Sequence, residues 1–146
     1  MEGLHILAEF RQCRGAPELL RDAAALESLC LGICHAAGLT VVGALFHPFG
    51  TPESPAGATG AVIFAESHLA LHTWPEQNAA TLDLYVCNFS RDNRPAAEDA
   101  YARLLSAFAP EKVTRRDIWR GGVSGIRCQV SGINPKTRPV LLTSDT

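Results

Sequence analysis

GAVIFAESHLALHTWPE, residues 60–76, decides the fold, because it joins two apolar runs at a short polar break. Each run has the length and alternation of a β-strand, and the break at residues 65–68 predicts a turn or bulge between them. Such a turn exposes the Glu66–Ser67 bond at the ends of two neighbouring strands. Without the bend, Ser67 and His72 would point to opposite faces of one strand. The pattern alone also fits a hairpin with a solvated tip, in which His72 is a hydrogen-bonded core histidine.

The rest of the chain supplies further strands and two helices. Strands are expected at 4–10, 40–46, 80–89 and 112–119, the last with a basic, exposed face. Ala- and Leu-rich stretches predict helices over 17–38 and 94–110, and the Pro/Gly/Ser-rich segment 48–60 predicts a loop. We therefore expect an α+β fold, a two-layer sandwich with two helices packed on one face of a mainly antiparallel sheet. The other face is left for a partner subunit.

Composition and charge limit the classes of function. Apolar residues make up 47% and charged residues 19%, as in a globular domain; we place this domain at residues 1–121, followed by a C-terminal tail at 122–146. A net charge of -2 without a basic run argues against a nucleic-acid partner. No apolar run approaches the ~20 residues of a membrane span. The absence of a secretory signal pattern and the odd number of cysteines, 5, predict reduced thiols in the cytoplasm.

Pairs of cysteines and histidines raise the question of a metal site. Cys30 and Cys34 are four residues apart in the first predicted helix, where two small apolar side chains on a buried face explain them better than a metal does. His68 and His72 would share one side of a strand, but no third ligand is evident, so we expect no metal. A serine hydrolase would need a GxSxG elbow, and the sequence around Ser67 reads AESHL instead.

Two motifs carry a resemblance to a known family. The stretch ESHLALHTWPE at 66–76, followed by DLYVC at 83–87, resembles the S-adenosylmethionine decarboxylase family in its short prokaryotic form. The resemblance covers most of residues 4–121 and includes HILAEF at 5–10 and FHPFG at 46–50. It implies a self-processing enzyme whose cofactor is a pyruvoyl group made from Ser67.

The resemblance also implies how the chain matures and acts. Ser67 attacks the carbonyl of Glu66, and elimination and hydrolysis leave a β chain of residues 1–66 and an α chain of 67–146 that starts with the pyruvoyl group. His72 is the implied base for processing. The pyruvoyl group forms a Schiff base with the substrate and accepts the electrons released with carbon dioxide. Cys87 is the implied proton donor, and His68 is expected to make a structural hydrogen bond.

Phe46 and Trp74 match family positions linked to adenine stacking, since aromatic faces suit both an adenine ring and a sulfonium cation. Glu76 lies in the same segment and is the third residue expected to bind the substrate. The implied reaction is decarboxylation of S-adenosylmethionine, which supplies aminopropyl groups for spermidine synthesis. The implied assembly is a homodimer of cleaved protomers whose active sites draw on both chains. This small-molecule chemistry needs no nucleic acid, membrane or metal.

Departures from the family pattern keep other substrates open. Residues 51–57 form an insertion that includes Glu53, Asn88 follows Cys87 where the family has glycine, and Gln77-Asn78 replaces a Gly-Tyr-like turn. An added acid such as Glu53 could bind the positively charged side-chain end of a basic amino acid, so L-ornithine or L-arginine remains an alternative substrate. A third hypothesis is a non-catalytic relative that serves as a binding or regulatory subunit. Ser67, His72 and Cys87 together argue against it.

Overall fold

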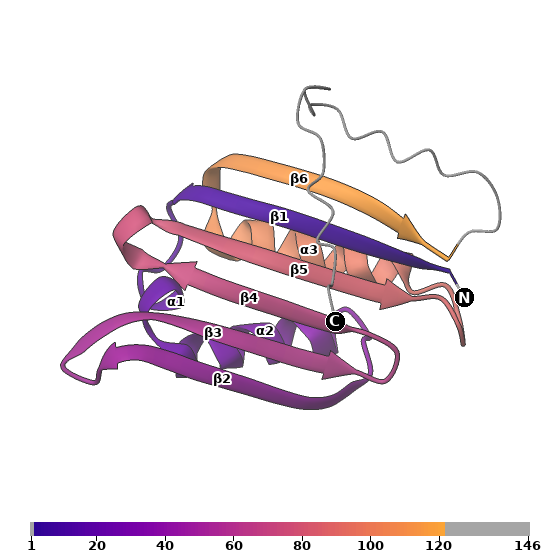
Figure 1. Cartoon of the computed structure of the whole chain (residues 1–146), viewed down its shortest axis with the longest axis horizontal. Helices are drawn as coiled ribbons and strands as arrows, with labels where there is room; N and C mark the ends of the chain where they lie inside the picture. Colours follow the sequence, from indigo (N-terminus) through magenta and orange to yellow (C-terminus); the bar gives the residue numbers. More distant parts are fainter. Residues whose placement is uncertain (1, 122–146) are drawn as a thin grey trace, which may run out of the picture.

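A computed structural model describes residues 2–121 of the chain, and these residues form one antiparallel sheet with helices on one side (Figure 1). The sheet has six strands in the order β2-β3-β4-β5-β1-β6. The strands are β1 (Gly3–Cys13), β2 (Val41–Thr51), β3 (Ser54–Phe64), β4 (His68–Trp74), β5 (Ala79–Cys87) and β6 (Pro110–Arg120). Every pair of neighbouring strands is antiparallel. The expected two-layer α+β sandwich is confirmed.

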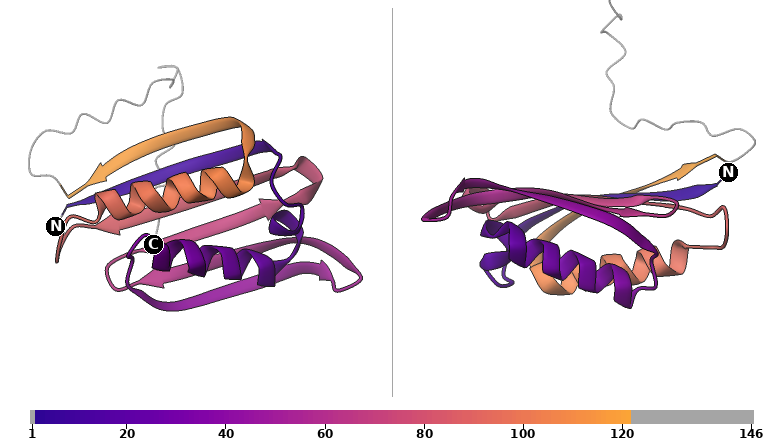
Figure 2. Two further views of the ribbon diagram at one scale, coloured as in Figure 1. Left: turned by 180° about the vertical axis from the view of Figure 1, so that it is seen from behind. Right: turned by 90° about the horizontal axis from the view of Figure 1, so that it is seen from below.

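The helices cover a single face of this sheet (Figure 2). They are α1 (Glu18–Arg21), α2 (Ala23–Ala36) and α3 (Arg94–Phe108). The first predicted helix is divided at Asp22, whose backbone is extended (φ -107°, ψ 116°) and whose side chain accepts a hydrogen bond from the N–H of Ala24. Asp22 thus caps the N-terminus of α2. Among the described residues, no helix is long and apolar enough to cross a membrane.

The core lies between the sheet and the helices. Alternate residues of the central strands point towards the helices and are buried, whereas their neighbours point to the other face. The largest fully buried side chains include Phe10, Leu69, Leu84, Leu104 and Phe108. Each burial of this kind stabilises the fold by about 1.5–3 kcal/mol. Cys30 and Cys34 are also fully buried on α2, as predicted for small apolar residues.

The prediction of a loop at 48–60 is wrong, because this segment extends a β-hairpin. β2 continues to Thr51 and β3 begins at Ser54. β2 is an edge strand, so a proline such as Pro48 can lie in it with its missing donor directed away from the ladder. Gly50 and Gly57 have positive φ angles of 81° and 115°, and the register shifts between Phe49 and Gly50. The glycines that suggested a loop therefore belong to an irregular but continuous pair of strands.

Candidate active site

The turn between β3 and β4 presents the Glu66–Ser67 bond at one end of the sheet. Phe64 donates its backbone N–H to the carbonyl of Ser67 at 2.8 Å, and the N–H of Ser67 lies 3.4 Å from the carbonyl of Phe64. The N–H of Ala65 is tied to the carbonyl of Thr40 at 2.9 Å. Ala65 and Glu66 therefore form a tight two-residue connection, and the bend expected from the polar break is confirmed.

Cys87 lies at the same end of the sheet, on the neighbouring strand. His68, the first residue of β4, pairs with Tyr85 of β5, so Cys87 is two residues beyond that pair and at the level of the turn. Its side chain is 3% exposed. The structure thus brings Ser67 and Cys87 to neighbouring strand ends.

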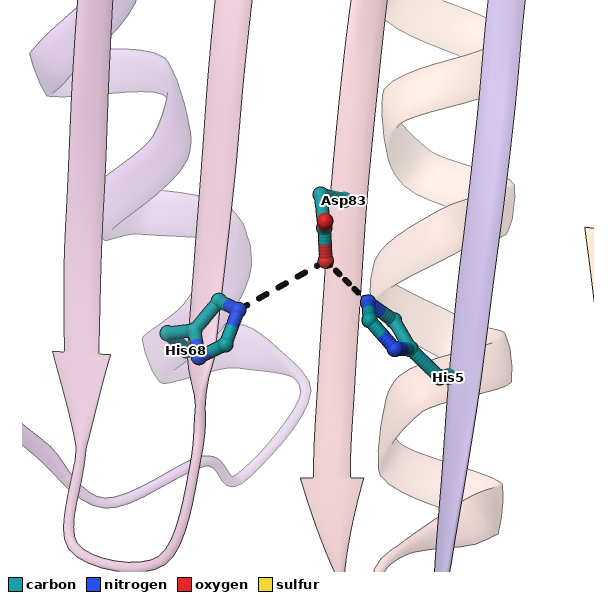
Figure 3. Close-up of side chains that lie close together, drawn as sticks. All are labelled: His5, His68 and Asp83. Carbon is teal, nitrogen blue, oxygen red and sulfur yellow. Dashed lines mark hydrogen bonds and ion pairs between the residues drawn. The ribbon is translucent and has the colours of Figure 1, made fainter. Parts of the chain in front are cut away.

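Three polar side chains converge beside this turn on the sheet face opposite the helices, which we call the open face (Figure 3). Nε2 of His5, on β1, donates a hydrogen bond to Oδ1 of Asp83, on β5. Nε2 of His68 lies 3.5 Å from the same oxygen. Their possible ligand atoms lie within 4.8 Å of one another, and two imidazoles with a carboxylate form a donor set that suits transition metals. Asp83 already pairs with both imidazoles, so its contact with His68 gives this histidine a structural role without any bound ion.

Tyr85 and Arg120 complete the surroundings of this cluster. The ring of Tyr85 lies 5.5 Å from that of His5 and 5.9 Å from that of His68, centroid to centroid. The guanidinium of Arg120, at the end of β6, lies over the Tyr85 ring, 4.4 Å from its centroid. The end of the sheet near Ser67 is therefore a closely packed aromatic and cationic surface.

His72 lies further along the open face. Its Nδ1 is 2.6 Å from Oγ1 of Thr59 on β3, in a hydrogen bond that fixes the ring. His72 is four residues from His68 on β4, which is about 13 Å along a strand. Within one chain the structure does not bring His72 together with Ser67.

Trp74 and Glu76 are further still from the turn. Trp74 ends β4 on the same face as His72 and is 41% exposed, and Glu76 lies in the short 3-10 turn of Pro75–Gln77. Asn78 ends this turn with a left-handed backbone (φ 49°), a conformation that asparagine tolerates better than most residues. The substituted Gln77-Asn78 pair therefore still makes a tight connection to β5.

The structure separates Phe46 from the other candidate residues. Phe46 pairs with Gly60, whose next partner is the buried Leu71, so its ring lies on the helix side of the sheet. A Cβ at Gly60 would lie 2.1 Å from Cδ1 of Phe46, which means that the ring packs directly on that glycine. Phe49, three residues later, pairs with Gly57, and its ring lies 5.6 Å from that of His47, centroid to centroid. His47 pairs with Thr59 on the open face, so Phe49 lies on that face too, and it is also 41% exposed.

A shallow depression of about 410 Å³ lies in the middle of the open face. Its lining includes Glu9, His72, Thr81, Asp83 and Arg116, so it connects the cluster beside Ser67 with the region of His72. Glu53, the added acid of the 51–57 insertion, lies instead at the tip of the β2–β3 hairpin, at the opposite end of the sheet from Ser67.

Comparisons with known proteins show which family the chain belongs to. A model of the S-adenosylmethionine decarboxylase family matches residues 4–121. The chain is 41% identical over 119 residues to a protein of Syntrophomonas wolfei named S-adenosylmethionine decarboxylase proenzyme, a match that covers 82% of this chain and 86% of the relative. A protein of the same name from Thermoplasma acidophilum is 34% identical over 119 residues, covering 82% and 83%.

The chain belongs to the S-adenosylmethionine decarboxylase family. Its fold also matches the crystal structure of the adenosylmethionine decarboxylase from Aquifex aeolicus, with a TM-score of 0.72 and 30% identity over 84% of this chain and 92% of that one. Family membership confirms the resemblance read from the two motifs at 66–76 and 83–87.

The places of four residues in this candidate site were not predicted from the sequence: His5, Phe49, Thr59 and Asp83. Strand alternation could have placed Asp83 and Tyr85 on one face of β5, two residues apart. The partner of Asp83 could not be found in the same way, because His5 is 78 residues away and meets it only through the β1–β5 register.

Proposed function

We propose that the chain cleaves its own Glu66–Ser67 bond and uses the resulting pyruvoyl group to decarboxylate S-adenosylmethionine. The main support is the placement of Ser67 in a tight turn beside the end of the strand that carries Cys87. A nucleophilic hydroxyl next to the bond and a thiol at the neighbouring strand end are two of the groups that this chemistry uses, together with a base. The names of the relatives support the choice of substrate.

Cleavage can be written with the residues of the turn. Oγ of Ser67 attacks the carbonyl carbon of Glu66, the amide C–N bond breaks, and an ester replaces it. A base then removes the Cα proton of Ser67, and the Cβ–Oγ bond breaks with its electron pair remaining on the Glu66 carboxylate. One water replaces the nitrogen of residue 67, which leaves as ammonia. A cavity of about 100 Å³ lined by Glu66, Ser67 and Arg91 has room for such water.

The residues around Ser67 fit a pyruvoyl group. This group supplies a carbonyl that binds the substrate amine and takes up the electrons released with carbon dioxide. His68 follows it in the chain and is held by Asp83, so the amide next to the carbonyl is fixed by a side-chain contact. Cys87 is the candidate that returns a proton to the reacting carbon, since a thiol can donate near neutral pH.

The complete site, in this proposal, is built from two chains. Ser67 and Cys87 lie at one end of the sheet, whereas His72, Trp74, Glu76 and Phe49 lie along it or at the other end. Packing two open faces with their strands antiparallel places one end of each chain against the opposite end of its partner. The open face exposes the large apolar residues Leu45, Ile63 and Ile118, at 76%, 46% and 47%, which suits such an interface.

Substrate binding then falls to the aromatic end of the partner's sheet. Phe49 and Trp74 offer faces for the adenine ring, and stacking of this kind contributes about 1–3 kcal/mol. Phe46 remains the residue that the sequence motif implies, but its ring lies against Gly60 on the helix side. Glu53 lies at a hairpin tip, and no contact of the described residues favours ornithine or arginine.

The first test separates an enzyme from a non-catalytic relative. Under denaturing conditions, mass spectrometry should find fragments of residues 1–66 and 67–146, the second blocked by a pyruvoyl group. Ser67→Ala should leave the chain intact. Carbon dioxide release is then measured with S-adenosylmethionine, ornithine and arginine in parallel. Turnover of a basic amino acid alone would refute the substrate, and an intact wild-type chain would refute the mechanism.

Cys87→Ala should allow cleavage and reduce turnover at least tenfold, because the carbanion loses its proton donor. Cys13→Ala is the matched control, since Cys13 is also a buried free cysteine. It lies at the end of β1, whereas Cys87 pairs with Gly3 at the start of that strand. Equal turnover in the two variants would remove Cys87 from the reaction.

Subunit complementation tests the two-chain site. Ser67→Ala and His72→Ala are each expected to be inactive, but a mixed dimer holds one site with both changes and one with neither. Co-expression at equal levels makes about half of all dimers mixed, so about a quarter of the wild-type activity should return. No recovery in mixed dimers isolated with two affinity tags would place both residues in the site of one chain.

A further inference from the structure

The loop between β5 and α3, residues 88–93, lies against the side-chain carboxylate of Glu66. The backbone N–H of Ser90 and Nδ2 of Asn93 each lie 3.4 Å from Oε2 of Glu66. Hydrogen bonds from Ser90 and the positive charge of Arg91 lower the pKa of Glu66, so its side chain is held as a carboxylate. Several donors and a cation from one loop thus converge on the residue whose carbonyl is attacked.

Asn93 connects this carboxylate to the strand that carries Cys87. Its side chain is buried, and Nδ2 also donates to the backbone carbonyl of Cys87 at 2.8 Å. Its Oδ1 accepts a hydrogen bond from Nε of Arg91 at 2.8 Å. Its backbone N–H donates to Oδ1 of Asn88 at 2.9 Å. One carboxamide therefore contacts the cleavage residue, the candidate proton donor's backbone and the cation of the loop.

Arg91 is itself held in place rather than extended into solvent. Besides its bond to Asn93, its guanidinium donates a hydrogen bond to the carbonyl of Gly38, which follows α2. Asn88, which stands where the family usually has glycine, also stabilises the loop, because its Oδ1 accepts the hydrogen bond from the backbone N–H of Asn93. The loop is thus organised by contacts on both sides before any substrate arrives.

We propose that residues 88–93 form a carboxylate-binding site that aims the Glu66–Ser67 bond at the attacking hydroxyl, with Asn93 and Arg91 as positioning residues. This proposal rests on the self-cleavage proposed above. Holding the Glu66 carboxylate restricts the orientation of the backbone carbonyl, because the turn already fixes the backbone of residues 64–67 and the bound carboxylate then leaves the side chain few conformations. Misplacement of reacting atoms by about 1 Å can slow a reaction roughly a hundredfold.

The test follows cleavage of freshly synthesised precursor over time. Asn93→Ala and Arg91→Gln should each slow cleavage at least tenfold, whereas Arg91→Lys keeps the charge but not both hydrogen bonds and should slow cleavage less than Arg91→Gln does. Arg103→Gln is the matched control, since Arg103 pairs with Asp99 on the exposed side of α3, away from the turn. Urea unfolding of each variant in a Ser67→Ala background shows that the fold is intact.

A double-mutant cycle separates positioning from a general loss of structure. In a Glu66→Ala background, which has no carboxylate to hold, Asn93→Ala and Arg91→Gln should change the cleavage rate less than twofold. Equal slowing in both backgrounds, or wild-type rates for Asn93→Ala and Arg91→Gln, would overturn the proposed role of the loop while self-cleavage stands. A wild-type chain that never cleaves would instead refute the proposed function itself.

Discussion

Replacing Phe46 and Phe49 in turn should separate a structural aromatic from a substrate-binding one. Phe46 is half-buried and its ring packs on Gly60, where an added Cβ would lie 2.1 Å from Cδ1 and 2.2 Å from Cε1. Truncation of a fully buried phenylalanine costs about 3–5 kcal/mol, so Phe46→Ala should cost about 2 kcal/mol of unfolding free energy. That corresponds to a fall in Tm of roughly 6–10 °C for a domain of this size. The KM for S-adenosylmethionine should change little.

Phe49→Ala should behave in the opposite way. Phe49 is 41% exposed on the open face, so its loss should cost less than about 1 kcal/mol of stability. If its ring stacks on adenine, KM should rise about five- to 150-fold, which corresponds to roughly 1–3 kcal/mol. Urea unfolding and initial rates of carbon dioxide release measure both quantities. Gly60→Ala is the control for Phe46, because it displaces the ring without removing it and should lower stability by about 1–3 kcal/mol. A raised KM for Phe46→Ala with an unchanged unfolding midpoint would refute this assignment of faces.

Single contacts give three further predictions. Thr59→Val removes the hydroxyl that forms a hydrogen bond with His72 at 2.6 Å, and it should slow cleavage or turnover about five- to tenfold. Thr59→Ser keeps a hydroxyl and should restore the rate. A normal rate for Thr59→Val would show that this hydrogen bond does not contribute. Burial raises the pKa of the Cys34 thiol to about 12 and raises that of the Cys30 thiol further. Iodoacetamide at pH ~8 should therefore leave both cysteines unmodified in the folded protein. Rapid labelling of either cysteine, seen by mass spectrometry, would contradict their burial. Thr73→Val leaves the buried backbone N–H of Ala58 without its partner and should cost about 1–3 kcal/mol in urea unfolding; an unchanged midpoint would show that the hydroxyl contributes nothing.

Local patterns in the sequence predicted the parts of the fold that depend on neighbouring residues. The polar break at residues 65–68 predicted the turn, because apolar alternation stops there and resumes with β4. The segment 48–60 misled for the same reason, since prolines and glycines normally end strands. The local sequence does not show that β2 lies at the edge of the described sheet, where one side of its backbone pairs with no neighbouring strand.

The faces of the edge strand were equally hard to predict. Most of β2 is exposed on both sides, so its sequence has no clear inside–outside alternation, and a register shift between Val41 and Gly43 reverses the parity of the later residues. Phe46 and Phe49 therefore cannot be assigned to faces from spacing alone. Their assignment depends on the partners Gly60 and Gly57 across the hairpin.

The length of β4 governs the organisation of the whole site. The strand runs from His68, beside the cleavage turn, to Trp74, and the six steps between these residues span about 20 Å. A substrate whose adenine stacks on Trp74 of the same chain would have to extend across that span to react at Ser67. Side chains of the turn could not contact a substrate at that distance. In the proposed dimer, a partner whose strands run in the opposite direction would remove this gap, because its Trp74 would lie over the Ser67 end. The proposed dimer would then account both for the absence of a helix on the open face within residues 2–121 and for the wide spacing of the site residues. In the proposed dimer, the face that the second chain covers would also be the face on which the two halves of the site meet.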